Sequence, residues 1–230
     1  MNIQGIQKLT LLDYPGKMAC IIFTGGCNFR CPFCHNSSLV INPNTESAYS
    51  DEELFAFLNK RKKVLDGVVI SGGEPLIQPD IEEYIRKIRN LGFLIKLDTN
   101  GTFPEKLIHL CDEGLIDYIA MDVKSSKENY SQCVGIKNYN IDKINESIEF
   151  LKNSNIDYEF RTTVAKGLHT EDDIKNLGEW IKGAKRHYIQ QFKDSGDIIG
   201  FGLSPFSEEE LVKFKSILSE YVLQCEIRGL

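Results

Sequence analysis

Three cysteines near the N-terminal end of the chain have the type and spacing of ligands for a metal cluster. Cys27, Cys31 and Cys34 form the pattern C-x3-C-x2-C, and no fourth cysteine lies nearby. Cysteine thiolates hold iron-sulfur clusters, and a four-iron cluster held by only three of them keeps one iron open to another ligand. The spacing therefore predicts a cluster with one accessible iron, which is a site suited to chemistry.

A zinc site is the competing interpretation of the same segment. Cys27, Cys31, Cys34 and His35 supply four ligands of the kinds that zinc prefers. Ligands at the adjacent positions 34 and 35 would strain a tetrahedral site, which favours the cluster. The remaining cysteines lack paired spacing and are interpreted as structural: Cys20, Cys111, Cys133 and Cys225.

Further polar residues follow directly after apolar runs that have the character of buried strands. The carboxyl ends of parallel strands share one rim in α/β folds, so these residues are expected to converge around one ligand. They are Gly72, Gly73 and Glu74 after residues 68–70, Asp98, Thr99 and Asn100 after residues 93–97, and Asp122 with Lys124 after residues 117–121.

Each of these residues also has an ordinary structural interpretation. Gly72 and Gly73 either let a backbone approach a ligand closely or simply make a turn. Asp122 and Lys124 form either a surface salt bridge or a charged pair that faces a ligand. Arg161 holds an anion if it points into the interior of the sheet, and it is a solvated residue if it points outward.

Alternating strand and helix patterns position these motifs. Apolar runs are followed by helical periodicity about six times, which demands right-handed parallel crossovers. Six units fall short of the eight of a closed barrel. We therefore predict an α/β fold, a partial (β/α)6 TIM-like barrel with parallel strands, in a single domain over residues 1–230. Three helix starts carry capping pairs: Ser50 with Glu53, Thr170 with Asp173, and Ser207 with Glu210.

The composition argues against two classes of partner. With 27 basic and 33 acidic residues the net charge is -6, which is not the footprint of a nucleic-acid binder. No apolar run approaches the roughly 18 residues of a membrane span, and residues 1–10 lack the pattern of an export signal. Seven cysteines without such a signal favour reduced thiols or metal ligands. We expect a cytoplasmic protein with no nucleic-acid or membrane partner.

Together the motifs resemble those of the radical S-adenosylmethionine (SAM) enzymes. The cysteine pattern and Gly72-Gly73-Glu74-Pro75 match the two superfamily motifs. Residues 98–101 and 121–124 look like those of glycyl-radical-enzyme activases. Residues 12–17 and 188–192 are most similar to activating proteins of anaerobic ribonucleoside-triphosphate reductase. The resemblance spans nearly the whole chain.

The resemblance implies a set of cofactor contacts. Cys27, Cys31 and Cys34 would bind a [4Fe-4S] cluster, whose fourth iron is chelated by the methionine moiety of SAM. Phe33 would lie near the adenine, and residues 72–74 would meet the methionyl amino group. The implied cofactor-binding residues are Phe33, Gly72, Gly73, Glu74, Asp98, Thr99, Asn100, Asp122, Lys124 and Arg161.

The resemblance also implies a reaction and its partners. A flavodoxin- or ferredoxin-type donor would supply one electron, SAM would be cleaved reductively, and the 5'-deoxyadenosyl radical would take a hydrogen from a backbone glycine of a glycyl-radical enzyme. The implied partner is anaerobic ribonucleoside-triphosphate reductase. In some activases a monovalent cation lies between acids that correspond to Asp98 and Asp122. No general acid or base is required, because the cofactor carries the difficult step.

The chain departs from the formate-lyase activases in two places, and two other functions stay open. Residues 190–193 read Gln-Gln-Phe-Lys where those activases carry a histidine, which puts a contact from Lys193 in doubt. The 37 residues between Cys34 and Gly72 contain no cysteine, so no additional cluster is expected.

The open alternatives are a radical SAM enzyme that acts on a small molecule, such as a 7-carboxy-7-deazaguanine synthase-like enzyme, and a non-catalytic zinc-binding module.

Overall fold

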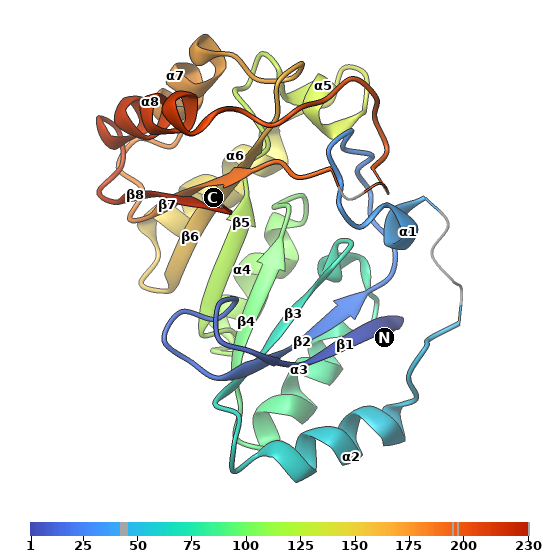
Figure 1. The fold of residues 1–230 in the computed structure, drawn as a ribbon. Helices are drawn as coiled ribbons and strands as arrows, with labels where there is room; N and C mark the ends of the chain where they lie inside the picture. The colour runs from blue at the N-terminus through green and yellow to red at the C-terminus, as the bar shows by residue number, and fades with distance from the viewer. Residues whose placement is uncertain (42–45, 195, 197, 230) are drawn as a thin grey trace. The chain divides into compact units, whose positions relative to one another are not determined.

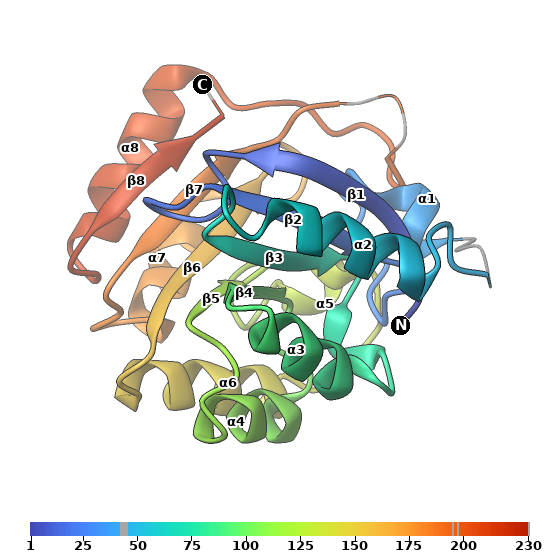
Figure 2. The same cartoon turned by 90° about the horizontal axis from the view of Figure 1, so that it is seen from below.

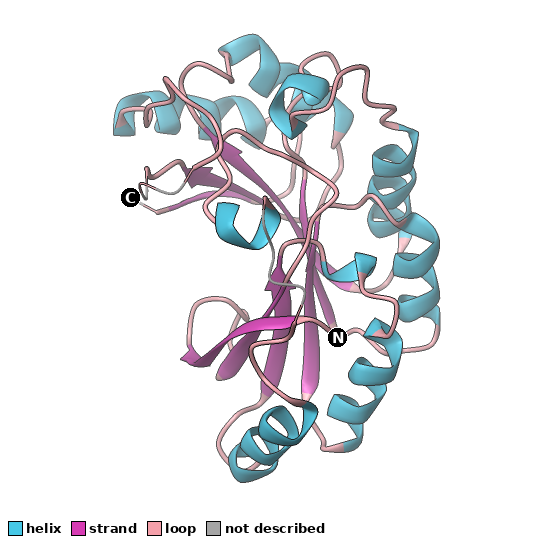
Figure 3. Cartoon of the chain, turned by 90° about the vertical axis from the view of Figure 1, so that its right-hand side faces the viewer, coloured by secondary structure: helices cyan, strands magenta, loops and turns pink. Residues whose placement is uncertain are grey.

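The chain folds as an α/β structure in which strands and helices alternate. The computed structural model describes residues 1–41, 46–194, 196 and 198–229. The strands of the sheet lie in the order β1-β2-β3-β4-β5-β6-β7-β8, which is also their order along the chain. Each strand from β2 to β7 is followed along the chain by a helix (Figures 1 and 3). The α/β class predicted from the sequence is therefore confirmed.

The contacts divide the chain into two compact units, which are described separately. The first unit comprises Met1–Asn28, Ser38–Thr99 and Phe103–Ala120. The second comprises Phe29–Ser37, Asn100–Thr102 and Met121–Leu230. The prediction of one domain over residues 1–230 stays a prediction.

In the first unit, a short antiparallel hairpin leads into parallel strands. β1 pairs antiparallel with β2, and β2, β3 and β4 pair in parallel. Most side chains of β2 and β3 are buried, as their continuous apolar sequences predict. Helix α3 buries one apolar face and packs against β4 (Figure 2). The bounds are β1 Ile3–Thr10, β2 Ala19–Thr24, α1 Ser37–Val40, α2 Asp51–Arg61, β3 Gly67–Gly72, the 3-10 helix η1 Pro75–Ile77, α3 Ile81–Asn90, β4 Leu94–Thr99 and α4 Pro104–Asp112.

In the second unit, three parallel strands are covered by two helices. β6, β7 and β8 pair in parallel, and α8 packs against α7, β7 and β8 (Figure 1). Helix α5 is only five residues long, too short for periodicity in the sequence to reveal it. The bounds are β5 Tyr118–Asp122, which begins in the first unit, α5 Tyr130–Val134, α6 Asp142–Asn153, β6 Asp157–Val164, α7 Glu171–Trp180, β7 His187–Gln191, α8 Glu208–Ser219 and β8 Cys225–Arg228.

The predicted helix starts are confirmed at all three capping pairs. In α2, α7 and α8 the side chain of the capping residue accepts a hydrogen bond from the backbone three residues later, and the acid there bonds back to the capping backbone. Each box satisfies amide groups that the first turn of a helix leaves without partners.

Candidate active site

The three predicted cluster ligands are distributed over the two units. Cys27 belongs to the first unit, and Cys31 and Cys34 belong to the second. The Cys34 amide donates to the Cys31 carbonyl over 3.0 Å, so these two cysteines share one tight turn. None of these three cysteines is in a disulfide, so each has the thiol group that an iron-sulfur cluster requires. Among the residues that the structure describes, no three His, Cys, Asp or Glu side chains form a ready metal site, so the ligand roles stay predictions.

In the first unit, the glycine pair lies against the segment that leads to Cys27. A Cβ at Gly73 would come within 1.9 Å of the Gly26 carbonyl oxygen, and Gly72 has a φ of +114°. The Gly73 and Glu74 amides donate to the Thr24 and Gly26 carbonyls over 2.9 and 2.8 Å. Chain packing alone therefore explains the glycine at position 73, which fixes the backbone next to Cys27. A contact of this glycine pair with a ligand stays a prediction.

Glu74 and Thr99, both predicted site residues, are joined in the first unit. The Glu74 side chain is fully buried, and its Oε1 accepts hydrogen bonds from the Thr99 hydroxyl at 2.8 Å and from the Leu76 amide at 3.0 Å. A buried carboxylate is costly unless donors surround it, and these contacts provide such donors. The segments that follow β3 and end β4 are thereby linked, and the convergence of these groups around one ligand stays a prediction.

Asp98 lies among side chains that sequence reasoning missed. The Lys96 ammonium contacts Asp98 Oδ1, and the Ser71 hydroxyl donates to Oδ2 over 3.0 Å. Lys96 is only 1% exposed, although it is a charged residue. The signal that could have revealed this pair is the single charge within the apolar run of residues 93–97, because a buried lysine needs an anion beside it.

In the second unit, Asp122 lies between two cations. Arg161 Nε donates to Asp122 Oδ1 over 2.9 Å, and Lys124 Nζ donates to Oδ2 over 3.1 Å. Arg161 therefore contacts a carboxylate of the chain itself, and a contact of Arg161 with a ligand stays a prediction. The three side chains are between 12% and 26% exposed, so the alternative of a solvated surface salt bridge is wrong.

The charges of Asp122, Lys124 and Arg161 set the protonation states of these side chains. Burial alone would raise the pKa of Asp122, but the Arg161 and Lys124 charges outweigh it and lower that pKa to about 2. Burial opposes the charge on Lys124, yet Asp122 and the nearby Cys31 and Cys34 sulfurs raise the Lys124 pKa above its usual value. All three groups are therefore charged at neutral pH.

Phe33 and Asn100 also belong to the second unit. Phe33 is buried, and its ring centroid lies 5.9 Å from Lys124 Nζ and 6.0 Å from the ring of His169. Asn100 is buried and its Oδ1 accepts hydrogen bonds from the Thr102 amide at 3.0 Å and hydroxyl at 2.7 Å, which closes the turn at this motif. His169 was not among the predicted site residues.

His35, the fourth ligand of the zinc alternative, packs on a ring in the second unit. Its imidazole stacks on Phe192 with centroids 5.8 Å apart and an interplanar angle of 27°. Phe192 lies in the segment where the sequence departs from the formate-lyase activases. The loop after β7 also lies against the cysteine segment, since the Gly200 amide donates to the Pro32 carbonyl over 2.8 Å.

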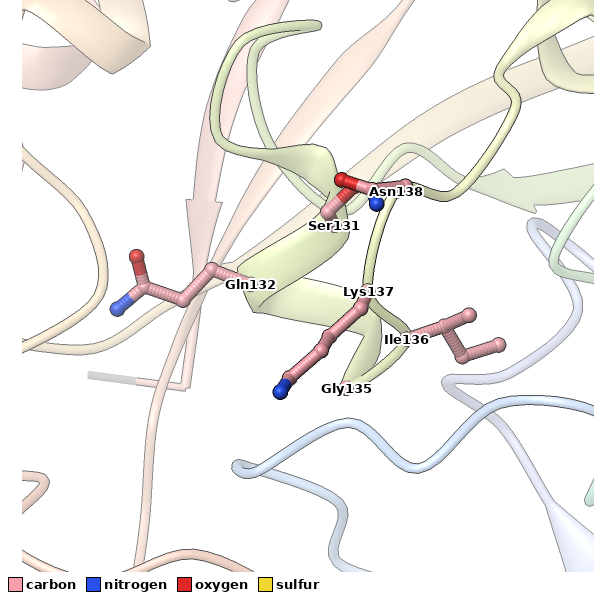
Figure 4. A pocket seen from close by; sticks show the side chains of 6 residues that line it. All are labelled: Ser131, Gln132, Gly135, Ile136, Lys137 and Asn138. Carbon is pink, nitrogen blue, oxygen red and sulfur yellow. The ribbon is translucent and has the colours of Figure 1, made fainter.

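A shallow pocket of about 430 Å³ lies on α5 and the loop that follows it (Figure 4). It contains none of the predicted site residues. One lining residue, Gly135, packs against the cysteine segment, because a Cβ there would meet the Arg30 carbonyl oxygen at 2.3 Å, and the Arg30 amide donates to the Val134 carbonyl over 2.9 Å. Its lining residues are Ser131, Gln132, Gly135, Ile136, Lys137 and Asn138.

Comparison with known protein families identifies the superfamily. The model described as "Radical SAM superfamily" matches residues 21–181, a stretch that contains the three cysteines and every other predicted site residue. The chain belongs to the radical SAM superfamily. Membership implies a [4Fe-4S] cluster and SAM as cofactors, and it confirms the enzyme class predicted from the sequence.

Two curated radical SAM proteins match almost the whole chain. A Methanocaldococcus jannaschii protein, assigned by inference as a glycyl-radical enzyme activating enzyme, is 36% identical over 98% of this chain and 95% of its own length. The pyruvate formate-lyase 1-activating enzyme of Escherichia coli is 27% identical over 96% of this chain and 87% of its own length. The predicted resemblance to this branch of the superfamily is therefore confirmed.

A solved radical SAM structure shares the fold. Streptococcus suis SuiB bound to the precursor peptide SuiA superposes with a TM-score of 0.70 at 15% identity, over 91% of this chain and 48% of SuiB. At this identity the match shows the fold alone. Radical SAM neighbours are partial TIM barrels, so the predicted fold class is confirmed, and the described part of the chain contains a mostly parallel sheet of eight strands.

The remaining expectations concern location and partners. None of the helices in the described part of the chain has the length and apolar character needed to cross a bilayer. Cytoplasmic location, the lack of a nucleic-acid partner and the nature of the electron donor stay predictions.

Proposed function

We propose that this chain is a glycyl-radical-enzyme activating enzyme. The observation that carries the proposal is the match to two activating enzymes over nearly the full length of all three chains. The charged groups after the strands of each unit also support it, because a carboxylate such as Glu74 can bind an amino group and an ammonium such as Lys124 can bind a carboxylate.

In this proposal, Cys27, Cys31 and Cys34 bind the [4Fe-4S] cluster. The bound cluster and SAM together supply the one-electron cleavage that yields a 5'-deoxyadenosyl radical. Gly73 holds the backbone on one side of Cys27 through its close approach to Gly26. The turn that joins Cys31 and Cys34 sets the spacing of the other two ligands.

Lys124 and Arg161 provide the positive charge for the carboxylate of SAM. Asp122 contacts both cations, so Lys124 can turn toward a ligand while Asp122 keeps its bond to Arg161. The raised pKa of Lys124 keeps its ammonium group charged at neutral pH. A charge-assisted bond in such a partly desolvated place is stronger than one in water.

Glu74 provides the acceptor for the amino group of SAM. It is buried and Thr99 fixes the orientation of its carboxylate. An ionised carboxylate accepts through several lone pairs, so the bonds from Thr99 and Leu76 leave it able to accept from an ammonium group as well. Lys96 balances Asp98, and Arg161 with Lys124 balances Asp122, so neither acid depends on the predicted monovalent cation for its charge balance.

The proposed protein substrate is a backbone glycine of anaerobic ribonucleoside-triphosphate reductase, with electrons from a flavodoxin- or ferredoxin-type donor. Residues 12–17 and 188–192 support this choice of partner through their similarity to the activating proteins of that reductase. Gln191 also has a structural role, since its Nε2 donates to the Phe206 carbonyl over 2.6 Å.

The test begins with anaerobic reconstitution of the cluster. With SAM and a reductant, the chain is expected to release 5'-deoxyadenosine, and the Cys31→Ala variant is expected to release none. Addition of the reductase is expected to produce a glycyl radical in the electron paramagnetic resonance (EPR) spectrum. Cleavage of SAM with no radical on any glycyl-radical enzyme would instead favour a small-molecule substrate.

A further inference from the structure

His169 contacts Phe33 and Lys124, two residues of the second unit to which the proposed function gives a role in SAM binding. Its side chain is only 5% exposed. Its ring centroid lies 6.0 Å from that of Phe33, and its Nε2 lies 2.9 Å from the carbonyl oxygen of Lys124. One imidazole therefore contacts both the ring assigned to adenine and the backbone of the lysine assigned to the carboxylate.

The partners of His169 select one neutral tautomer. A carbonyl oxygen can only accept, so the contact with Lys124 requires a proton on Nε2. The Ala165 amide lies 3.2 Å from Nδ1 and can only donate, so Nδ1 accepts. The Ala165 carbonyl is farther from Nδ1, at 3.4 Å, and already accepts from the His169 amide at 3.1 Å. Burial also lowers the pKa of His169, which favours the neutral ring.

Two further hydrogen bonds join the loop after β5 to the segment that follows β6. Asn129 Nδ2 donates to the Leu168 carbonyl over 2.6 Å, and the Ser126 hydroxyl donates over 2.9 Å to Asp173 in the first turn of α7. The loop after β5 is thus bonded twice to the loop after β6, through His169 and Asn129, and once to α7. Lys124 forms a charged triad with Asp122 and Arg161. Of the three contacts, only the one from His169 ends on a member of this triad, because its acceptor is the Lys124 carbonyl.

Cys133 is adjacent to His169 but does not form a nucleophilic pair with it. The Cys133 sulfur lies 3.7 Å from Nε2, whose proton is directed to the nearer Lys124 carbonyl. Cys133 is fully buried, and burial raises the pKa of its thiol to about 12. The thiol is therefore protonated at neutral pH and inaccessible, which excludes thiolate chemistry at this position.

We propose that His169 is a positioning residue for SAM, which holds the Lys124 backbone through its Nε2–H group and packs its ring against the Phe33 ring. This inference rests on the proposed function, because Phe33 and Lys124 matter for SAM only if the chain binds it. The proposed role of His169 is therefore indirect. Its effect is on the placement of Phe33 and Lys124.

The first test needs no variant and no cluster. Nitrogen NMR of cluster-free protein with labelled histidine is expected to show His169 with a pyrrole-type Nε2 and a pyridine-type Nδ1 at neutral pH. Ring-to-backbone correlations assign the signal. A coupling across the hydrogen bond from Nε2 to the Lys124 carbonyl carbon would support the contact directly. A ring protonated on Nδ1 would overturn the inference.

The second test separates the hydrogen bond from the ring. His169→Phe keeps an aromatic face and loses the donor, whereas His169→Gln keeps an N–H donor and loses the ring. His169→Phe is expected to raise the KM for SAM about tenfold, the size of one lost buried hydrogen bond, with kcat at saturating SAM within about twofold of the parent. A smaller increase is expected for His169→Gln. Cys133→Ala, which removes the neighbouring thiol, is the matched control and is expected to leave KM unchanged.

The EPR spectrum of the reduced cluster, titrated with SAM, gives the same affinities without turnover. Failure of the parent chain to cleave SAM would contradict the proposed function. Normal cleavage by the parent together with an unchanged SAM affinity in folded His169→Phe, or a loss in kcat alone, would contradict only the role of His169. If the variants do not fold, the tautomer and the hydrogen-bond coupling in the parent chain decide.

Discussion

The first and second units form two halves of the chain that use buried lysines for different purposes. In the first unit Lys96 is 1% exposed and lies against Asp98, among groups that also bond to one another across β3 and β4. In the second unit Lys124 is 15% exposed and shares Asp122 with Arg161. The named groups of the first half comprise two carboxylates and one ammonium, and those of the second comprise one carboxylate and two cations. In the proposed function, Glu74 of the first half accepts from the amino group of SAM, and Lys124 of the second half binds its carboxylate.

Replacing the two lysines gives the largest expected difference between the halves. Lys96→Met removes the ammonium beside Asp98 and is expected to lower the free energy of unfolding by about 3 kcal/mol or more. Lys124→Met leaves Asp122 bonded to Arg161, so its stability is expected to change by less than about 1 kcal/mol, whereas the Kd for SAM rises about a hundredfold. Urea unfolding and SAM titration measure the two effects. Equal stability losses would show that the halves do not differ in this way.

A side chain at Gly73 tests how the first half holds Cys27. Gly73→Ala forces a Cβ toward the Gly26 carbonyl and is expected to cost about 1–3 kcal/mol of stability and to reduce the iron bound after reconstitution. Gly5→Ala is the control, since its Cβ would lie at an ordinary 3.5 Å from Phe23. Full iron loading of Gly73→Ala would contradict a role for this glycine at the cluster.

Acid is expected to weaken the second unit before the first. His187 is fully buried there, and burial lowers its pKa from 6.5 to about 3, whereas His109 of the first unit is 53% exposed. The unfolded chain protonates His187 below pH 6.5 and the folded chain does so only near pH 3. Stability therefore falls as the pH falls through this window, by up to about 1.4 kcal/mol per pH unit.

Hydrogen exchange between pH 7.5 and 4.5 resolves this acid effect for each unit. Amides of the second unit are expected to lose protection first. His187→Leu is expected to reduce the change of stability per pH unit, because it removes the titrating group. If stability changes equally with pH in the parent and in His187→Leu, another group controls the acid sensitivity.

The smallest expected effect tests whether the units unfold together. Ser50→Ala and Ser207→Ala each remove a capping side chain, one in each unit, and each is expected to cost about 1 kcal/mol. Trp180, the single tryptophan, reports on the second unit. If the chain is one domain, Ser50→Ala shifts the fluorescence transition as much as Ser207→Ala does. A shift caused by Ser207→Ala alone would argue for two separately unfolding units.

The features that the sequence predicted correctly are those that depend on the periodicity of apolar residues and on the order of short segments along the chain. Strand ends with polar residues, the capping pairs and the burial of Cys20 all depend on short segments, and the structure contains them. His169 gave no such signal, because its partner Lys124 is 45 residues earlier in the chain and the contact ends on a backbone oxygen. For Gly73 the sequence left open a close approach to a ligand or a simple turn, and the structure adds a reason that neither included, because a Cβ there would meet the Gly26 carbonyl.

Transfer of deuterium is the most direct test of the central proposal. Anaerobic ribonucleoside-triphosphate reductase labelled with α-deuterated glycine is incubated with the reconstituted chain, SAM and a reductant. The account predicts deuterium in 5'-deoxyadenosine and a matching amount of glycyl radical in the EPR spectrum, with both greatly reduced in Lys124→Met. Formation of unlabelled 5'-deoxyadenosine at the same rate with and without the reductase, and no glycyl radical, would contradict it.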